Sequence, residues 1–273
     1  MVSLPASIPA SIARRFMFCR FTAAPALIRF VVIQHSYAEF LGTFEAQLER
    51  RDIGFTYVRP VTGQDVIGSA LQYDALWMLG GAYSVGDREH CPWVDDELRL
   101  VTIFQKARRP VVGIGFGGHL VAAASGGVVH DEPFHDAYWT TAHATDLGRA
   151  DPLALAVDGR RVLVMANGRV ELPAGVAPIV VDDAGRWIAV RPEPLTVGML
   201  FRPELKPGMI EDMIMEEDRP VPDTIGELLE EARARWSEMQ ETTDRVMAAL
   251  VASLDLMHER RKMPVFTMTV KRD

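Results

Sequence analysis

Cysteine is scarce in this chain, and long hydrophobic runs are missing from it. Two cysteines among 273 residues argue against a disulfide framework and fit a reducing cytoplasm. No apolar run approaches the ~18 residues of a membrane span, and a net charge of −8 argues against nucleic acid as a partner. We therefore expect a cytoplasmic globular protein that binds neither membranes nor nucleic acid.

The first 38 residues of the chain contain no acidic residue, and the first one is Glu39. Residues 1–27 contain three arginines with several serines and alanines, a composition typical of an organellar transit peptide. We prefer the alternative of an upstream start codon in a bacterial gene, because the rest of the chain is rich in Ala, Arg and Val. In both cases we expect residues 1–27 to be poorly ordered unless a partner holds them.

A nucleophile is absent from the most distinctive segment, VVGIGFGGHL at residues 111–120. Its apolar start predicts a buried strand, its glycines predict a sharp turn, and Leu120–Ala124 predicts a helix. A strand–turn–helix of this kind is a nucleophile elbow, which presents a catalytic Ser or Cys beside backbone N–H donors. The tip of this elbow is Gly115, which has no side chain.

Strands and helices alternate in the first half of the chain. We expect strands at Arg29–Ile33, Phe55–Val61, Ala75–Leu79 and Val111–Ile114, and helices at Leu41–Glu49 and Trp93–Ala107. This order predicts an α/β fold, a mostly parallel flavodoxin-like sheet with helices on both faces. Any site should lie at the carboxyl ends of the strands, where Gly80 and Gly115 fall. After Val128 we expect short β segments, with turns at Asn167-Gly168 and Ala184-Gly185.

The end of the chain predicts a helical extension. Pro220 and Pro222 mark a linker, and Thr224 opens a heptad-like apolar stripe, which we expect to bend near residues 241–243. The stripe either packs on the chain's own core or contacts a partner through Leu229, Trp236, Met239, Val246 and Leu250. We thus divide the chain into 1–27, 28–218 and 219–273, the last ending in a loose tail or an added edge strand.

The ordered set of segments from about Ile28 to Met215 resembles a class I glutamine amidotransferase domain of the GMP-synthase-like group. The matching segments are VVIQHSYAEFLGTFEAQLERRDIGF, DALWMLGGAYSVGD, CPWVDDELRLVTIFQKARRPVVGIGFGGHLVAAASGG, GRADPLALAV and MLFRPELKPGMIEDMI. The resemblance implies that Gly80 and Gly81 form the oxyanion loop and that Phe116 and His119 border the pocket.

The catalytic triad of that family is degenerate here. The resemblance places Gly115 where the family has its Cys nucleophile and Arg202 where it has its general-base His, while Glu204 keeps the orienting carboxylate. Glycine cannot attack carbon, and arginine stays protonated at ordinary pH. We expect that this site does not hydrolyse glutamine. Arg202 then either forms an ion pair with Glu204 or binds an anion in the former glutamine pocket.

Other reactive side chains give weaker hypotheses. Cys91 lies away from the elbow tip and is expected to be a small, partly buried hydrophobic residue. His130 and His135 stand among acidic residues, but without metal-site spacing we expect a solvated loop, no metal and no cofactor.

Three functions follow as hypotheses. The first is a catalytically inactive, structural or channelling subunit of a larger bacterial enzyme complex, for instance an amine-oxidising enzyme of nitrogen metabolism. The second is a protein that binds a small carboxylate or amine in the degenerate pocket. The third is an enzyme with different chemistry that uses His119 or Glu204.

Overall fold

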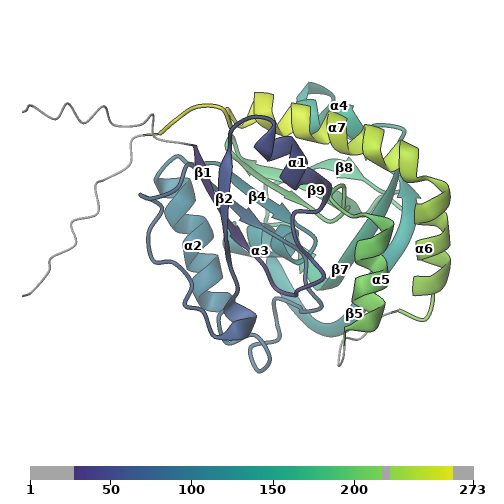
Figure 1. The fold of residues 1–273 in the computed structure, drawn as a ribbon, viewed down its shortest axis with the longest axis horizontal. Helices are drawn as coiled ribbons and strands as arrows, with labels where there is room; N and C mark the ends of the chain where they lie inside the picture. The colour runs from purple at the N-terminus through teal and green to yellow at the C-terminus, as the bar shows by residue number, and fades with distance from the viewer. Residues whose placement is uncertain (1–27, 217–221, 261–273) are drawn as a thin grey trace, which may run out of the picture.

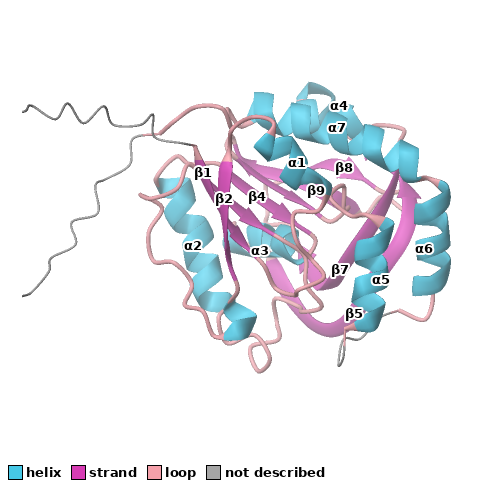
Figure 2. Ribbon diagram, viewed as in Figure 1, coloured by secondary structure: helices cyan, strands magenta, loops and turns pink. Residues whose placement is uncertain are grey.

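A mixed eight-stranded sheet forms the centre of the protein in the computed structural model (Figures 1 and 2). The structure describes residues 28–216 and 222–260, and their side chains except at 131–136. The strand order is β2-β1-β3-β4-β10-β9-β8-β6. Strands β2 (Gly54–Val58), β1 (Arg29–Ile33), β3 (Ala75–Met78), β4 (Val111–Ile114) and β10 (Thr196–Met199) run parallel. Strands β9 (Trp187–Glu193), β8 (Pro178–Val181) and β6 (His143–Ala144) continue the sheet in antiparallel pairs.

A second, two-stranded sheet stands beside the first. Its long antiparallel strands are β5 (Val128–Thr141) and β7 (Arg161–Glu171). The expected turn at Asn167-Gly168 is wrong, because both residues lie within β7, at an irregularity in its register with β5. The pairing with β5 continues on both sides of this irregularity, so Gly168 (φ 75°) bends the strand without ending it.

Helices cover both faces of the main sheet. The helices are α1 (Thr43–Glu49), α2 (Val94–Lys106), α3 (Phe116–Ala124), α4 (Pro152–Val157), α5 (Pro207–Met215), α6 (Ile225–Ala234) and α7 (Trp236–Ser253), with 3-10 turns at Pro60–Thr62 and Gly148–Ala150. Successive side chains of a strand point to opposite faces. Phe30 and Val32 of β1 accordingly pack in the core with α1, α4 and α7, whereas Val31 and Ile33 pack in the core with α2 and α3. The predicted α/β architecture with helices on both faces is confirmed.

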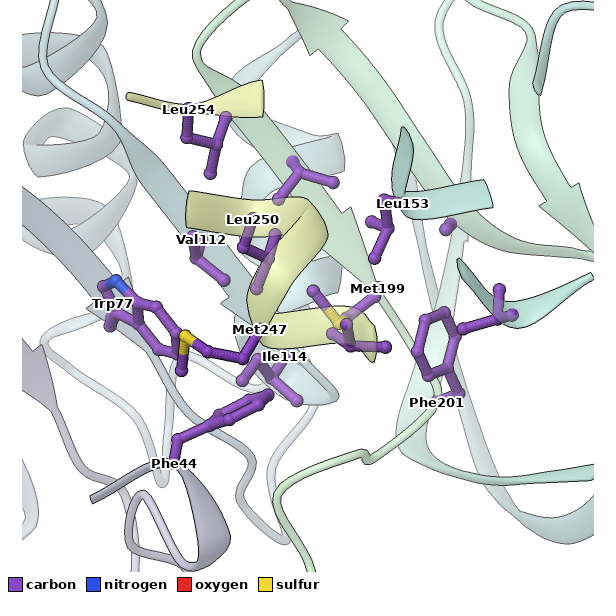
Figure 3. Close-up of a cluster of buried hydrophobic side chains, with 14 of the residues drawn as sticks. Phe44, Trp77, Val112, Ile114, Leu153, Met199, Phe201, Met247, Leu250 and Leu254 are labelled. Atoms are coloured by element: carbon purple, nitrogen blue, oxygen red, sulfur yellow. The ribbon is translucent and has the colours of Figure 1, made fainter. Parts of the chain in front are cut away.

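The core beneath α7 is built from aromatic, aliphatic and Met side chains (Figure 3). Trp77 of β3 meets Phe44 of α1 edge to face, with ring centroids 5.3 Å apart. An aromatic pair of this geometry contributes about 0.5–1.5 kcal/mol beyond its buried area. Met247, Leu250 and Leu254 pack in the same cluster. A helix far along the sequence therefore packs in the same core as the central strands.

The C-terminal helical region differs from its expected form. The stripe is divided at Arg235 between α6 and α7, and Thr242 and Thr243 lie inside α7 instead of at a bend. Residues 222–256 are not a separate appendage, because α7 completes the core of the sheet and α6 packs on the outer face of the β5–β7 ribbon. Residues 1–27, most of the predicted linker and the tail from residue 261 lie outside the described residues.

Candidate functional site

The elbow is present as a tight turn between β4 and α3. Gly115 joins the two elements with φ 58° and ψ −117°, a conformation that glycine adopts easily and other residues adopt with strain. Its N–H donates to Met199 O at 2.8 Å, and its carbonyl accepts from the N–H of Gly118 at 2.9 Å. The backbone thus has the geometry that exposes a nucleophile, although this residue supplies none.

The space at the elbow tip is filled. A Cβ atom added to Gly115 would lie 2.9 Å from Met165 O and 3.2 Å from Cδ of Arg202. A Cβ atom added to Gly80, in the loop after β3, would lie 2.0 Å from Oε2 of Glu39 and 2.4 Å from Nη1 of Arg202. The two glycines therefore flank one guanidinium group.

Arg202 is held between two carboxylates. Its Nε lies 2.6 Å from Oε1 of Glu204, and its Nη2 lies 2.7 Å from Oε2 of Glu39. All three side chains are buried, with at most 2% of each exposed. Burial disfavours the charged guanidinium, but the two carboxylates outweigh burial and raise the pKa of Arg202. Burial raises the pKa of the Glu204 carboxyl, and Arg202 offsets only part of that effect.

This cluster decides between the two hypotheses for Arg202. The structure shows the ion pair with Glu204 and adds a second one with Glu39. Because the guanidinium already contacts both carboxylates and is almost fully buried, it is not presented to an external anion. The structure therefore supports the ion-pair hypothesis.

A buried histidine–glutamate pair adjoins the oxyanion loop. His35 Nε2 lies 3.1 Å from Oε1 of Glu97, and His35 Nδ1 lies 3.1 Å from the carbonyl oxygen of Gly80. Burial lowers the pKa of His35, but Glu97 outweighs burial, so the pKa is raised overall. Since both ring nitrogens face acceptors, the doubly protonated imidazolium suits this position. Phe116 packs edge-on against the same ring at 4.8 Å between centroids.

The predicted loop glycines lie where the sequence places them. Gly80 and Gly81 follow β3, and a Cβ atom on Gly81 would approach Cβ of His35 to 2.8 Å. Sequence reasoning missed Glu39, His35 and Glu97. The signal was available for His35 and Glu39, because both follow the first parallel strand at its carboxyl end.

His119 faces a different space from the elbow tip. It lies in the first turns of α3, is 4% exposed, and contacts Trp187 edge-on at 5.7 Å between ring centroids. Burial lowers the pKa of His119 to about 4, and the ring is therefore neutral near pH 7. Its Nδ1 lies 3.2 Å from the carbonyl oxygen of Asn167.

A pocket of about 660 Å³ opens beside His119. The other residues that line it come from β5, β7, β8 and β9, from the connections between β7, β8 and β9, and from the residue after β10: Tyr138, Gly168, Arg169, Val170, Glu171, Leu172, Val176, Pro178, Gly185, Arg186, Trp187 and Leu200. Gly80, Gly115 and Arg202 are not among them. The sequence-based expectation of one pocket shared by the elbow and His119 is therefore wrong.

Among the side chains that the structure describes, the other reactive ones form no second centre. Cys91 is buried, and burial raises the pKa of its thiol to about 12, which makes it a poor nucleophile. His130 pairs with Glu171 at 3.2 Å, while the side chain of His135 lies outside the described ones. Within the described residues, no group of three His, Cys, Asp or Glu side chains is arranged to hold a metal ion. No helix in that part of the chain is both long and apolar enough to cross a membrane.

The predicted partner contacts lie inside the protein. Leu229 and Met239 are each at most 8% exposed and pack with α5 and the β5–β7 ribbon, and the partly buried Trp236 packs beside them. Val246 and Leu250 are fully buried against the sheet. The apolar stripe thus packs on the chain's own core. Its first part contacts α5 and the two-stranded β5–β7 sheet, and its second part contacts the main sheet.

Comparison with known proteins shows similarity to a glutamine amidotransferase-like protein in sequence and to glutamine amidotransferases in structure. The chain is 30% identical over 129 residues to YfeJ, a glutamine amidotransferase-like protein of Salmonella typhimurium, a match that covers 46% of this chain and 53% of that protein. The match thus spans about half the length of the relative. No family model matches the chain.

Two solved structures have the same fold. A glutamine amidotransferase from Methylobacillus flagellatus superposes with a TM-score of 0.71 at 22% identity, over 89% of this chain and 100% of that one. A glutamine amidotransferase from Thermotoga maritima superposes with a TM-score of 0.69 at 17% identity, over 84% of this chain and 99% of that one.

Proposed function

We propose that this chain, which has the class I glutamine amidotransferase fold and is similar in sequence to a glutamine amidotransferase-like protein, does not hydrolyse glutamine. We propose further that it serves as a non-catalytic subunit of a larger enzyme. One observation carries the proposal: the guanidinium of Arg202 lies between Glu39 and Glu204 and fills the space beside Gly115.

Chemistry at the elbow would need two groups that this cluster lacks. A thiolate attacks the amide carbon, and an imidazole moves the proton between nucleophile and leaving ammonia. Gly115 has no atom that can attack, and Arg202 has no lone pair that can accept a proton. Glu204 then holds a structural cation in place of an imidazole.

Substitute nucleophiles and bases are poorly placed. The Cys91 thiol is protonated at ordinary pH because burial raises its pKa to about 12. His119 lines the separate pocket, whereas Glu204 is fully buried against Arg202. The two residues named for an alternative chemistry therefore do not share one site.

An exposed apolar surface supports the role as a subunit. Tyr37 is 70% exposed and Met215 is 80% exposed. The two segments that carry them are joined by a hydrogen bond from the N–H of Ala38 to Glu216 at 3.0 Å. Large apolar side chains gathered on a surface are typical of protein–protein contacts. We place the partner subunit at this surface, next to the loop that carries Glu39, in a bacterial complex of nitrogen or amine metabolism.

A glutaminase assay tests the catalytic half of the proposal. Purified protein is incubated with glutamine, and ammonia and glutamate are measured for the unchanged chain and for Glu204→Gln. We expect no release above the uncatalysed background from either. Release that is present in the unchanged chain and lost in Glu204→Gln would overturn the proposal.

The native mass tests the subunit half. The protein is purified from its own host under mild conditions, and each co-purifying chain is identified. We expect a complex of fixed ratio that dissociates in a Tyr37→Glu/Met215→Glu variant but persists in the control Glu238→Gln, which changes a partly exposed residue of α7. A monomer or homodimer in every preparation would count against a subunit.

The pocket beside His119 favours a second candidate function, the binding of a small molecule. Its volume of about 660 Å³ lies within the range of ~300–1,000 Å³ that is usual for ligand sites. This candidate differs from the original hypothesis in its location, because Arg202 is not part of the pocket.

A further inference from the structure

The pocket beside His119 has a hydrogen-bond acceptor in its wall. Because His119 is neutral and its Nδ1 faces the carbonyl oxygen of Asn167, the proton sits on Nδ1 and Nε2 carries a lone pair. Within the described residues Nε2 has no hydrogen-bond partner, and it is not one of the buried side-chain atoms that lack one, so it reaches the space of the pocket that His119 lines. A ligand that donates a hydrogen bond to this nitrogen gains affinity over one of the same shape that has no donor.

The walls around this acceptor are aromatic and aliphatic. Trp187 is fixed by a hydrogen bond from its Nε1 to Val170 O at 2.9 Å, which leaves its ring as an apolar wall. Tyr138 of β5 also lines the pocket, and Val170, Leu172 and Leu200 contribute aliphatic surface. Such walls suit a flat ring, because aromatic side chains favour stacked or edge-to-face contacts with another ring.

The charges at the rim are already neutralised. Arg169 pairs with Glu171 at 2.7 Å, and Arg186 pairs with Asp182 at 2.7 Å while it also covers the Tyr138 ring. An anionic or cationic ligand would have to compete with these internal partners. The pocket therefore favours an uncharged ligand.

We propose that this pocket binds an uncharged, planar, bicyclic aromatic molecule whose single N–H or O–H group donates a hydrogen bond to Nε2 of His119. The pocket contains neither Gly115 nor Arg202. A test of ligand binding there is therefore independent of the proposed loss of glutamine hydrolysis. It gives the second candidate function a ligand class.

Two probes of the same shape test the hydrogen bond. Indole carries an N–H donor, and benzofuran has an oxygen at the same place and no donor. Their affinities for the full chain are measured by calorimetry. We expect indole to bind about 3- to 10-fold more tightly than benzofuran, the range that one neutral hydrogen bond supplies. In His119→Phe, which keeps a ring against Trp187, the two probes should bind equally.

The controls separate the pocket from nonspecific binding. Val176→Trp, at the pocket wall, should weaken both probes by at least about tenfold, the effect of losing one well-packed contact. His90→Phe, on an exposed loop residue, should change neither affinity. Because His119 titrates near pH 4, the preference for indole should be the same at pH 8 and pH 6. Equal affinities for indole and benzofuran in the unchanged chain, or no binding of either, would overturn the proposal.

Discussion

At the scale of single residues, Arg202 determines what the elbow can do. It occupies the position that the resemblance gives to a general base, and it contacts two carboxylates instead of a thiol. A buried ion pair costs desolvation on each side, and this cost is recovered only while every partner is present. The cluster is therefore sensitive to the loss of its single cation.

Removing that cation should strongly destabilise the fold. Arg202→Met leaves Glu39 and Glu204 buried without a counter-ion, and we expect a loss of about 3–5 kcal/mol in the free energy of unfolding. Urea denaturation followed by circular dichroism measures it. Arg99→Met removes an exposed arginine paired with Asp96 and should change little. A loss for Arg202→Met as small as that of the control would show that the cluster is not structural.

Restoring the nucleophile alone should not restore activity. Gly115→Cys places a Cβ atom 2.9 Å from Met165 O in a backbone conformation with positive φ, and we expect a destabilisation of about 1–3 kcal/mol. Gly175→Cys is the matched control, because Gly175 also has positive φ but its Cβ would meet no atom within 4 Å. Glutamine turnover by Gly115→Cys, or equal stability of the two variants, would contradict this view of the elbow tip.

The sequence predicted part of this site. The glycine turn at Gly115 and the loop at Gly80 follow from local pattern, and the structure places both at the carboxyl ends of neighbouring strands. Glu39 and His35 were not predicted, because a charged side chain in a loop is normally solvated and only the tertiary fold buries it. The separation of His119 from the elbow tip depends on how β7 and β9 pack against α3, which local periodicity does not encode.

At the scale of elements, the His35–Glu97 pair connects the end of β1 to α2. His35 also contacts the carbonyl oxygens of Leu79 and Gly80, and it thereby joins three segments around the oxyanion loop. Because its pKa is raised in the fold, the folded state binds the proton more tightly than the unfolded chain does. This contribution is fully present below the unfolded pKa of about 6.5 and is lost as the pH rises through the folded pKa.

The protein should accordingly lose stability as the pH is raised above about 6.5. Urea unfolding at several pH values measures the loss. The double variant His35→Gln/Glu97→Gln, which keeps hydrogen-bonding groups without a titrating ring, should flatten this dependence. His143→Gln, at an exposed pair with Asp183, should leave it unchanged. An unchanged slope in the double variant would assign the pH dependence to other groups.

The elements themselves were predictable where they are uniformly apolar. β1, β3 and β4 were located to within a residue, because parallel strands buried on both faces give short continuous apolar runs. The break at Arg235 was missed, because charged residues on both sides of it continue the helical pattern. The binding partner of the heptad-like stripe could not be predicted from the sequence. A helix that packs on another subunit and a helix that packs on its own sheet have the same spacing of apolar residues.

At the scale of the whole molecule, α7 closes the sheet. Val246, Met247, Leu250 and Leu254 are fully buried, and they pack in one cluster with the buried strand residues Phe30, Trp77 and Val112. Burying four such side chains contributes roughly 6–12 kcal/mol, which is comparable to the whole stability of a typical domain.

A chain that ends at residue 216 should therefore fail to fold. We expect loss of cooperative unfolding and recovery in the insoluble fraction, because Trp77 and Val112 would face water. A chain that ends at residue 260 retains α7 and is the control. Soluble, cooperatively unfolding protein from the shorter chain would show that residues 222–260 are dispensable for the core.

The crowding around Arg202 also limits how this sequence can drift. A side chain at position 115 or 80 collides with the fold while the arginine is present, and the arginine cannot leave without stranding two buried acids. A single substitution that adds a side chain at position 115 or removes the cation at position 202 thus gives a less stable protein. The two glycines and the arginine are coupled, so exchanging one of them calls for a change in the others as well.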